Sequence, residues 1–127
     1  MILPITLCSA AAAALINAWL AIRCGQVRTA EKILMGDGGN DTLIARMRAQ
    51  ANFVENTPFV LALIAALELA LGGSTALAAV AGVYMIGRVL HALGMEGGTF
   101  AKGRMVGTMI TLLTLLGLSI WAILTAL

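Results

Sequence analysis

Charged residues are scarce in this chain of 127 residues: they make up 11% of it, whereas hydrophobic residues make up 61%. Soluble globular domains are usually about 45–50% apolar and about 25% charged. A soluble chain of this length has too little polar surface to cover so much apolar material. The composition therefore excludes an ordinary soluble domain and predicts an integral membrane protein, with residues 1–127 forming a single domain.

Cysteine, histidine and net charge are also limited, with two cysteines, one histidine and a formal net charge of +2. Cys8 lies in an apolar segment and Cys24 at the end of one, so we expect no disulfide framework. His91 has no clustered Cys, Asp or Glu partners, so we expect no metal site. The small net charge gives no indication of nucleic-acid binding.

The N-terminus lacks the positively charged segment with which a secretory signal peptide begins. Its apolar run, MILPITLCSAAAAALINAWLAI, is also longer than the hydrophobic region of a signal peptide. We therefore interpret this run as a retained transmembrane helix.

Four apolar segments are long enough to span a bilayer, which requires about 20 mostly apolar residues. They predict helices over residues 2–22, 41–71, 75–95 and 104–126. The second helix begins with polar turns, because Asn40 or Asp41 can act as its N-cap. The predicted fold is all-α, with four transmembrane helices in a left-handed up-down bundle.

Lysine and arginine are unevenly distributed among the connections. They gather in or beside the first and third connections, whereas both termini and the turn at residues 72–74 carry none. The positive-inside rule places basic loops in the cytoplasm. We therefore expect a multi-pass protein with both termini on the non-cytoplasmic side of the cell membrane.

Polar side chains form stripes at the cytoplasmic ends of the second and third helices, with i, i+4, i+7 spacing. The stripes are Arg48, Asn52 and Glu55 on the second helix and Tyr84, Arg88 and His91 on the third. An ionisable group at membrane depth is costly unless it is paired or wetted, so it indicates a functional site. We expect Glu55 to pair with Arg48 or Arg88.

Several of these polar residues also have structural explanations. Arg46 and Arg48 are suited to anchoring at lipid headgroups. Asn52 and Asn56 are suited to hydrogen bonds between helices. Glu68, near the far end of the second helix, is suited to reaching the opposite interface.

A pocket built from these stripes would contain several guanidinium groups, one carboxylate and several amides. Arginine binds carboxylates in a bidentate geometry. The expected ligand is therefore anionic overall and carries an amine for the carboxylate of Glu55. A small peptide with two carboxylates and one amine meets both requirements, and the surrounding lipid would deliver apolar co-substrates.

The segment RMRAQANFVENTPF at 46–59 resembles the second-helix signature R-x-x-x-N-x-x-E-x-x-P of the MAPEG family, the membrane-associated proteins in eicosanoid and glutathione metabolism. The GDGG turn before it is similar to that of short bacterial members. YMIGRVLHALG at 84–94 and GRMVGTMITLL at 103–113 resemble the third and fourth helices of the family. The resemblance implies a homotrimer in the bacterial inner membrane, with glutathione sites between subunits.

The resemblance also implies roles for individual residues. The implied glutathione-binding residues are Arg28, Arg48, Gln50, Asn52, Glu55, Arg88 and His91. Arg104 matches the arginine that stabilises the glutathione thiolate in several eukaryotic members and is the predicted catalytic residue, with Lys102 as the alternative cation. The sequence departs from the family at Asn56, where many members have tyrosine, and at His91 and Met95, where some have aromatic residues that contact glutathione.

The predicted function is a membrane-bound glutathione transferase, with possible peroxidase activity, that conjugates the glutathione thiolate to lipophilic electrophiles. Its expected partners are glutathione, lipophilic small molecules, membrane lipids and further copies of the chain. One alternative is a non-catalytic membrane protein that binds glutathione or another small anion. Another is a small multidrug exporter, which the absence of an acidic residue in the first helix disfavours.

Overall fold

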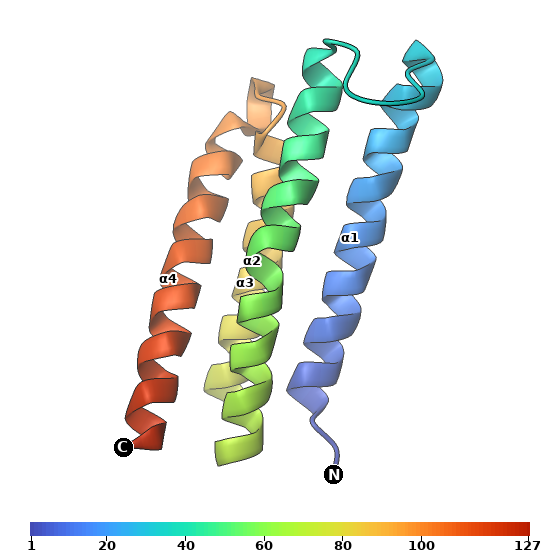
Figure 1. Ribbon diagram of the computed structural model, residues 1–127. Helices are drawn as coiled ribbons and strands as arrows, with labels where there is room; N and C mark the ends of the chain where they lie inside the picture. The colour runs from blue at the N-terminus through green and yellow to red at the C-terminus, as the bar shows by residue number, and fades with distance from the viewer.

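The computed structural model describes all 127 residues and is built from four long helices (Figure 1). The elements are α1 Pro4–Glu31, α2 Asp41–Leu71, α3 Thr75–Gly94, the short 3-10 turn η1 Gly98–Phe100, and α4 Ala101–Ala126. The helices alternate in direction, so both termini lie at one end of the bundle. All four are long and apolar enough to cross a membrane, which confirms the predicted all-α membrane architecture.

The helix ends differ from the prediction mainly in α1, which continues to Glu31 instead of ending near residue 22. Apolar character marks the part of a helix that lies in lipid, but a helix ends only where its backbone geometry changes. Here the change comes at Lys32, whose φ of 56° is left-handed and whose N–H donates to the carbonyl of Arg28. Residues 23–31 therefore extend α1 by roughly 13 Å beyond its apolar run.

Side-chain caps define the starts of α2 and α3. Asn40 Oδ1 accepts a hydrogen bond from the backbone N–H of Leu43 at 2.9 Å, so Asn40 rather than Asp41 is the N-cap of α2. Ser74 Oγ accepts from the N–H of Leu77 at 3.1 Å in the same way. Each bond satisfies a backbone donor that has no partner within its own helix.

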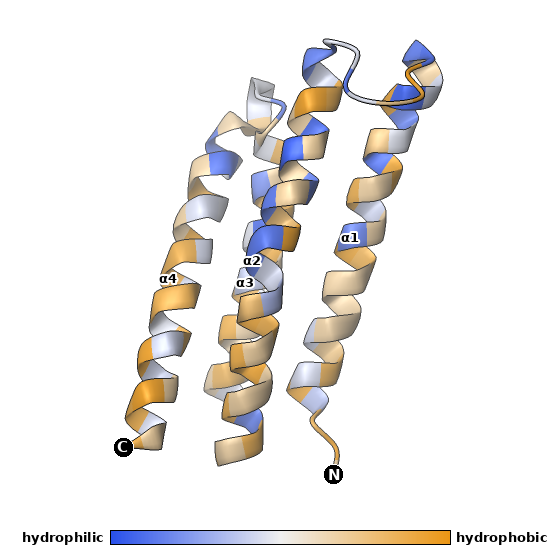
Figure 2. Ribbon diagram, viewed as in Figure 1, coloured by the Kyte–Doolittle hydropathy of each residue, from blue (hydrophilic) through white to orange (hydrophobic).

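The bundle is divided into a polar half and an apolar half. Figure 2 shows hydrophilic residues gathered in the half that carries the α1–α2 connection and η1, which we call the loop end. In the other half the core consists of aliphatic side chains, including the buried Val60, Ile64, Leu67, Leu77 and Leu118. Among the buried polar groups, Arg88, His91 and Thr111 lie toward the loop end, whereas Glu68 lies toward the opposite end.

Glycines allow α3 and α4 to approach backbone to backbone. A Cβ atom added at Gly107 would lie 2.5 Å from the carbonyl oxygen of Gly87, and one added at Gly103 would lie 2.5 Å from that of Leu90. Real side chains do not fit at such separations. Small residues at helix contacts are typical of membrane bundles, where close van der Waals packing takes the place of the hydrophobic effect.

Glu68 has a role that the sequence did not indicate, because its carboxylate is bonded within the bundle. Only 2% of its surface is exposed. Its carboxylate accepts hydrogen bonds from the backbone N–H groups of Ile5 at 2.9 Å and Thr6 at 2.7 Å, and from Thr6 Oγ1 at 2.7 Å. Glu68 therefore caps the first turn of α1, which has no side-chain cap of its own.

This contact predicts that Glu68→Ala weakens the attachment of α1 to the bundle. The substitution leaves two backbone donors without a protein partner in an apolar setting, so we expect the melting temperature in detergent to fall by about 5 °C or more. Glu31→Ala is the control, because Glu31 is exposed and its side chain makes no hydrogen bond or ion pair. Equal melting temperatures for the two variants, measured by circular dichroism, would contradict the capping role.

Candidate functional site

A buried guanidinium joins α2, α3 and α4 near the loop end. Arg88 on α3 is 1% exposed. Its Nη2 donates to Asn52 Oδ1 on α2 at 2.5 Å, and its Nη1 donates to Thr111 Oγ1 on α4 at 2.8 Å. Thr111 Oγ1 in turn donates to the carbonyl of Gly107 at 2.8 Å. The two predicted stripes therefore meet, and Asn52 and Arg88 are in direct contact.

Further polar groups extend this row along α2. Asn56 Nδ2 donates to the backbone carbonyl of Asn52 at 2.8 Å, so Asn56 bonds within its own helix rather than across helices. The hydroxyls of Thr57 and Tyr84 share a buried hydrogen bond of 2.9 Å between α2 and α3. Tyr84, the first residue of the α3 stripe, thus supports the packing of the site and has no open surface.

The charge of Arg88 has no counter-charge in the chain. Its hydrogen-bond partners are neutral, and its Nε is buried without a partner, as is Nδ1 of His91 one turn further along α3. The expected pairing of Glu55 with Arg48 or Arg88 is wrong for the single chain, whose only ion pairs join Glu96 to two other arginines. The physical reason is that Asn52 occupies the position facing Arg88, whereas Glu55 is exposed.

Three of the predicted site residues lie open on the surface of the chain. Arg48 and Glu55 on α2 and Arg104 on α4 are exposed, and their side chains make no hydrogen bond or ion pair. Lys102, the alternative cation, is exposed as well. The first turn of α4 contains no acidic residue and its N-cap makes no side-chain hydrogen bond. Lys102 and Arg104 therefore lie at the N-terminus of α4, the positive end of its helix dipole. This position is suitable for binding an anion.

The main cavities of the single chain lie away from these exposed residues. One of about 470 Å³ between α3 and α4 is lined mainly by apolar side chains such as Val83, Leu113 and Trp121. A polar one of about 320 Å³ lies between α1 and the start of α2, beside Gln26 and Arg46. None of the four main cavities is lined by the stripe residues, so the pocket expected from the sequence is not among the main cavities of one chain.

Two other predicted site residues, Gln50 on α2 and Arg28 on α1, lie where these two helices face each other. Gln50 Nε2 donates to Asn17 Oδ1 at 3.3 Å, and Gln50 Oε1 lies 4.0 Å from the Cys24 sulfur. Arg28 donates from Nη1 to the carbonyl of Gly36 at 2.8 Å and so fastens the α1–α2 connection. The structure therefore does not bring Gln50 and Arg28 together with Arg48, Glu55 and Arg88.

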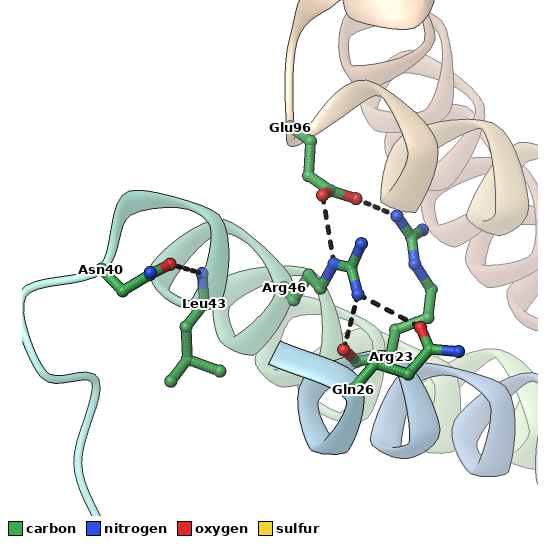
Figure 3. A network of polar contacts seen from close by, with 6 residues as sticks. All are labelled: Arg23, Gln26, Asn40, Leu43, Arg46 and Glu96. Atoms are coloured by element: carbon green, nitrogen blue, oxygen red, sulfur yellow. Dashed lines mark hydrogen bonds and ion pairs between the residues drawn. The ribbon is translucent and has the colours of Figure 1, made fainter. Parts of the chain in front are cut away.

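Arg46, interpreted from the sequence as a possible headgroup anchor, belongs to an internal network instead. Its Nε donates to Glu96 Oε1 at 3.1 Å, and its Nη1 donates to the carbonyl of Arg23 at 2.7 Å (Figure 3). Sequence reasoning missed Glu96, although it is the only carboxylate in the connection between α3 and α4. It also missed Thr111, because a threonine in an apolar helix carries no signal of its own.

One comparison with known proteins gives a match. The family model described as the MAPEG family matches residues 6–124, nearly the whole chain. Among curated proteins, none matches the chain. The matched region contains every site residue predicted from the sequence, from Arg28 to Arg104. On this evidence the chain belongs to the MAPEG family.

Proposed function

We propose that this protein is a membrane-bound glutathione transferase that conjugates the glutathione thiolate to lipophilic electrophiles dissolved in the bilayer. The observation that carries the proposal is the exposed pair Arg48 and Glu55, which has no partner within the chain although it stands on a membrane helix. Ionisable groups in such a place are retained for function. Membership of a family that includes glutathione transferases gives the pair its most direct explanation.

The charges of the site match glutathione. Three arginines, at positions 48, 88 and 104, stand against the single carboxylate of Glu55. Glutathione brings two carboxylates and one ammonium group, so a carboxylate suits the exposed guanidinium of Arg48 and the ammonium suits Glu55. Charge-assisted hydrogen bonds of this kind are the strongest that a protein makes with a small polar ligand.

Arg88 acts in this proposal through Asn52 rather than by direct contact, because it is almost completely buried. It fixes Asn52 Oδ1 as an acceptor, and Asn52 Nδ2 makes no hydrogen bond within the chain. The amide N–H₂ group is thereby oriented as a donor for a glutathione carboxylate or backbone carbonyl. Such support of a ligand-binding group by a second residue holds its geometry constant before the ligand arrives.

A second copy of the chain completes the site in this proposal. Arg48, Glu55 and Arg104 lie open, and none of the four main cavities of the single chain includes them. The remaining wall comes from a neighbouring subunit, in a homotrimer as the family resemblance implies. With the loop end facing the cytoplasm, glutathione enters from the aqueous side and the electrophile enters from the membrane.

The chemistry requires the thiol of glutathione to lose its proton to solvent, because the thiolate is the nucleophile. A free thiol has a pKa of about 8.5, and each unit by which a site lowers it corresponds to about 1.4 kcal/mol. Arg104 supplies a positive charge at the N-terminus of α4, where the helix dipole adds to it. The thiolate sulfur then forms a bond to the electrophilic carbon, and the leaving group departs with the bonding electrons.

Glutathione titration of the detergent-purified protein tests the site. We expect Glu55→Gln and Arg48→Ala each to weaken binding by roughly tenfold or more, because each removes one charged contact. Glu31→Gln provides a matched loss of a surface carboxylate outside the site, and its affinity should equal that of the wild type. Calorimetry that finds the same affinity in all four proteins would remove this site assignment.

Turnover distinguishes catalysis from binding alone. A non-catalytic member of the family would bind glutathione with the same dependence on Arg48 and Glu55 but would not conjugate it. Incubation of the purified protein with glutathione and a chlorodinitrobenzene electrophile in detergent or lipid vesicles measures this directly. A rate no greater than that of the buffer would reduce the proposal to glutathione binding.

A further inference from the structure

A single carboxylate, that of Glu96, links the connection between α3 and α4 (residues 95–100) to α1 and α2. Glu96 accepts from Arg23 on α1 through Oε2 and from Arg46 on α2 through Oε1, the latter at 3.1 Å (Figure 3). All three side chains are largely covered, with exposures of 13%, 20% and 23% for Arg23, Arg46 and Glu96. Two guanidinium groups share this one carboxylate, and a network of several charges contributes more than an isolated surface ion pair.

The chain between Glu96 and α4 makes few polar contacts of its own. Gly97 and Gly98 both have positive φ, at 78° and 68°, and reverse the chain direction. α4 then begins at Ala101, and its N-cap, Phe100, makes no side-chain hydrogen bond. The start of α4 packs on α3 at Gly94 and Gly103, and the Glu96 network is the side-chain contact that joins this region to α1 and α2.

We propose that Glu96 is a positioning residue, which ties the connection before α4 to α1 and α2 and thereby helps to place Arg104 for its action on the thiolate. This inference rests on the proposed function, since Arg104 has that role only there. Glu96 itself does not touch the ligand in this account. It fixes one end of the segment 95–100, whose glycines would otherwise let the guanidinium group of Arg104 change position.

Arg23 and Arg46 keep other contacts when the charge of Glu96 is lost, so the structural effect of that loss is local. Arg46 Nη1 also donates to the Arg23 carbonyl at 2.7 Å and to Gln26 Oε1 at 3.3 Å. The Arg23 guanidinium also lies 4.9 Å from the centre of the Trp19 ring, a cation–π contact. Loss of the Glu96 charge therefore leaves α1 and α2 joined. It also leaves two neighbouring guanidinium groups without their shared counter-charge, so the connection to α4 is released.

Glu96→Gln in the full-length protein tests the inference, with Glu96→Asp as the conservative variant and Glu31→Gln as the matched control. In Glu96→Gln we expect faster amide hydrogen exchange confined to residues 97–104. We also expect kcat to fall about tenfold with KM for glutathione within about twofold, because Arg104 is displaced while Arg48 and Glu55 are not. The ultraviolet absorbance of bound thiolate should decrease, Glu96→Asp should recover part of both losses, and Glu31→Gln should match the wild type.

Three results would overturn the inference: unchanged exchange in residues 97–104, faster exchange along all four helices, or a rise in KM with kcat preserved. The exchange measurement needs no glutathione. If the wild type fails to bind glutathione, the proposed function fails, and the exchange data still decide whether Glu96 fixes the start of α4. If the wild type binds and turns over glutathione but Glu96→Gln behaves identically, only the positioning role is lost.

Discussion

Replacing Arg104 with alanine is expected to lower kcat for glutathione conjugation by roughly 10²-fold or more, while the dissociation constant for glutathione changes by less than about tenfold. The reason is that different residues of the proposed site contact different parts of glutathione. Arg48 and Glu55 contact the charged ends of the tripeptide, whereas Arg104 stabilises the negative sulfur. Loss of a group that acts mainly on the thiolate affects turnover more than binding.

Lys102→Ala is the matched control for this experiment, because Lys102 carries the same charge, is exposed and lies two residues earlier in α4. Steady-state kinetics with a chlorodinitrobenzene electrophile and the ultraviolet absorbance of bound thiolate give two independent measures. If Lys102→Ala lost turnover and thiolate absorbance while Arg104→Ala kept both, the thiolate role would pass to Lys102. If neither variant changed them, the positive end of α4 would have no catalytic role.

The transmembrane architecture followed from the sequence because apolar run length has a direct physical meaning in a bilayer. The end of α1 did not follow, since residues 23–31 are helical but too polar to be counted as a span. Glu68 was misinterpreted for another reason. Its partners, Ile5 and Thr6, are more than 60 residues away in the chain, and only the packing of α1 against the end of α2 brings them together.

The part of the site that depends on helical spacing alone was predictable from the sequence. The spacing of Asn52 and Arg88 on their helices gave the contact between α2 and α3 that the structure contains. Periodicity does not fix how far each helix is rotated about its own axis, so it could not show that Glu55 faces outward while Asn52 faces Arg88. The same limit applies to Thr111 and to Glu96, whose partners depend on the relative placement of three helices.

The small residues between α3 and α4 lead to a second large expected effect. Gly107→Ala should destabilise the protein, because the new Cβ would lie 2.5 Å from both the Gly87 carbonyl oxygen and the Cβ of His91. A backbone atom cannot rotate away, so α4 must move outward. Overpacking of this kind usually costs about 1–3 kcal/mol or more. Outward movement of α4 would also stretch the Arg88–Thr111 hydrogen bond, so we expect glutathione binding to weaken together with stability.

Gly117→Ala is a control within the same helix. Nothing lies within 4 Å of a Cβ added at Gly117, which borders the hollow between α3 and α4. Alanine is favoured over glycine in a helix by up to about 1 kcal/mol, so this variant should melt at or above the wild-type temperature. The two identical chemical changes thus predict shifts of opposite sign. Thermal unfolding in detergent decides between this account and a loose contact of α3 with α4, which would let Gly107→Ala gain the same helical stabilisation as Gly117→Ala.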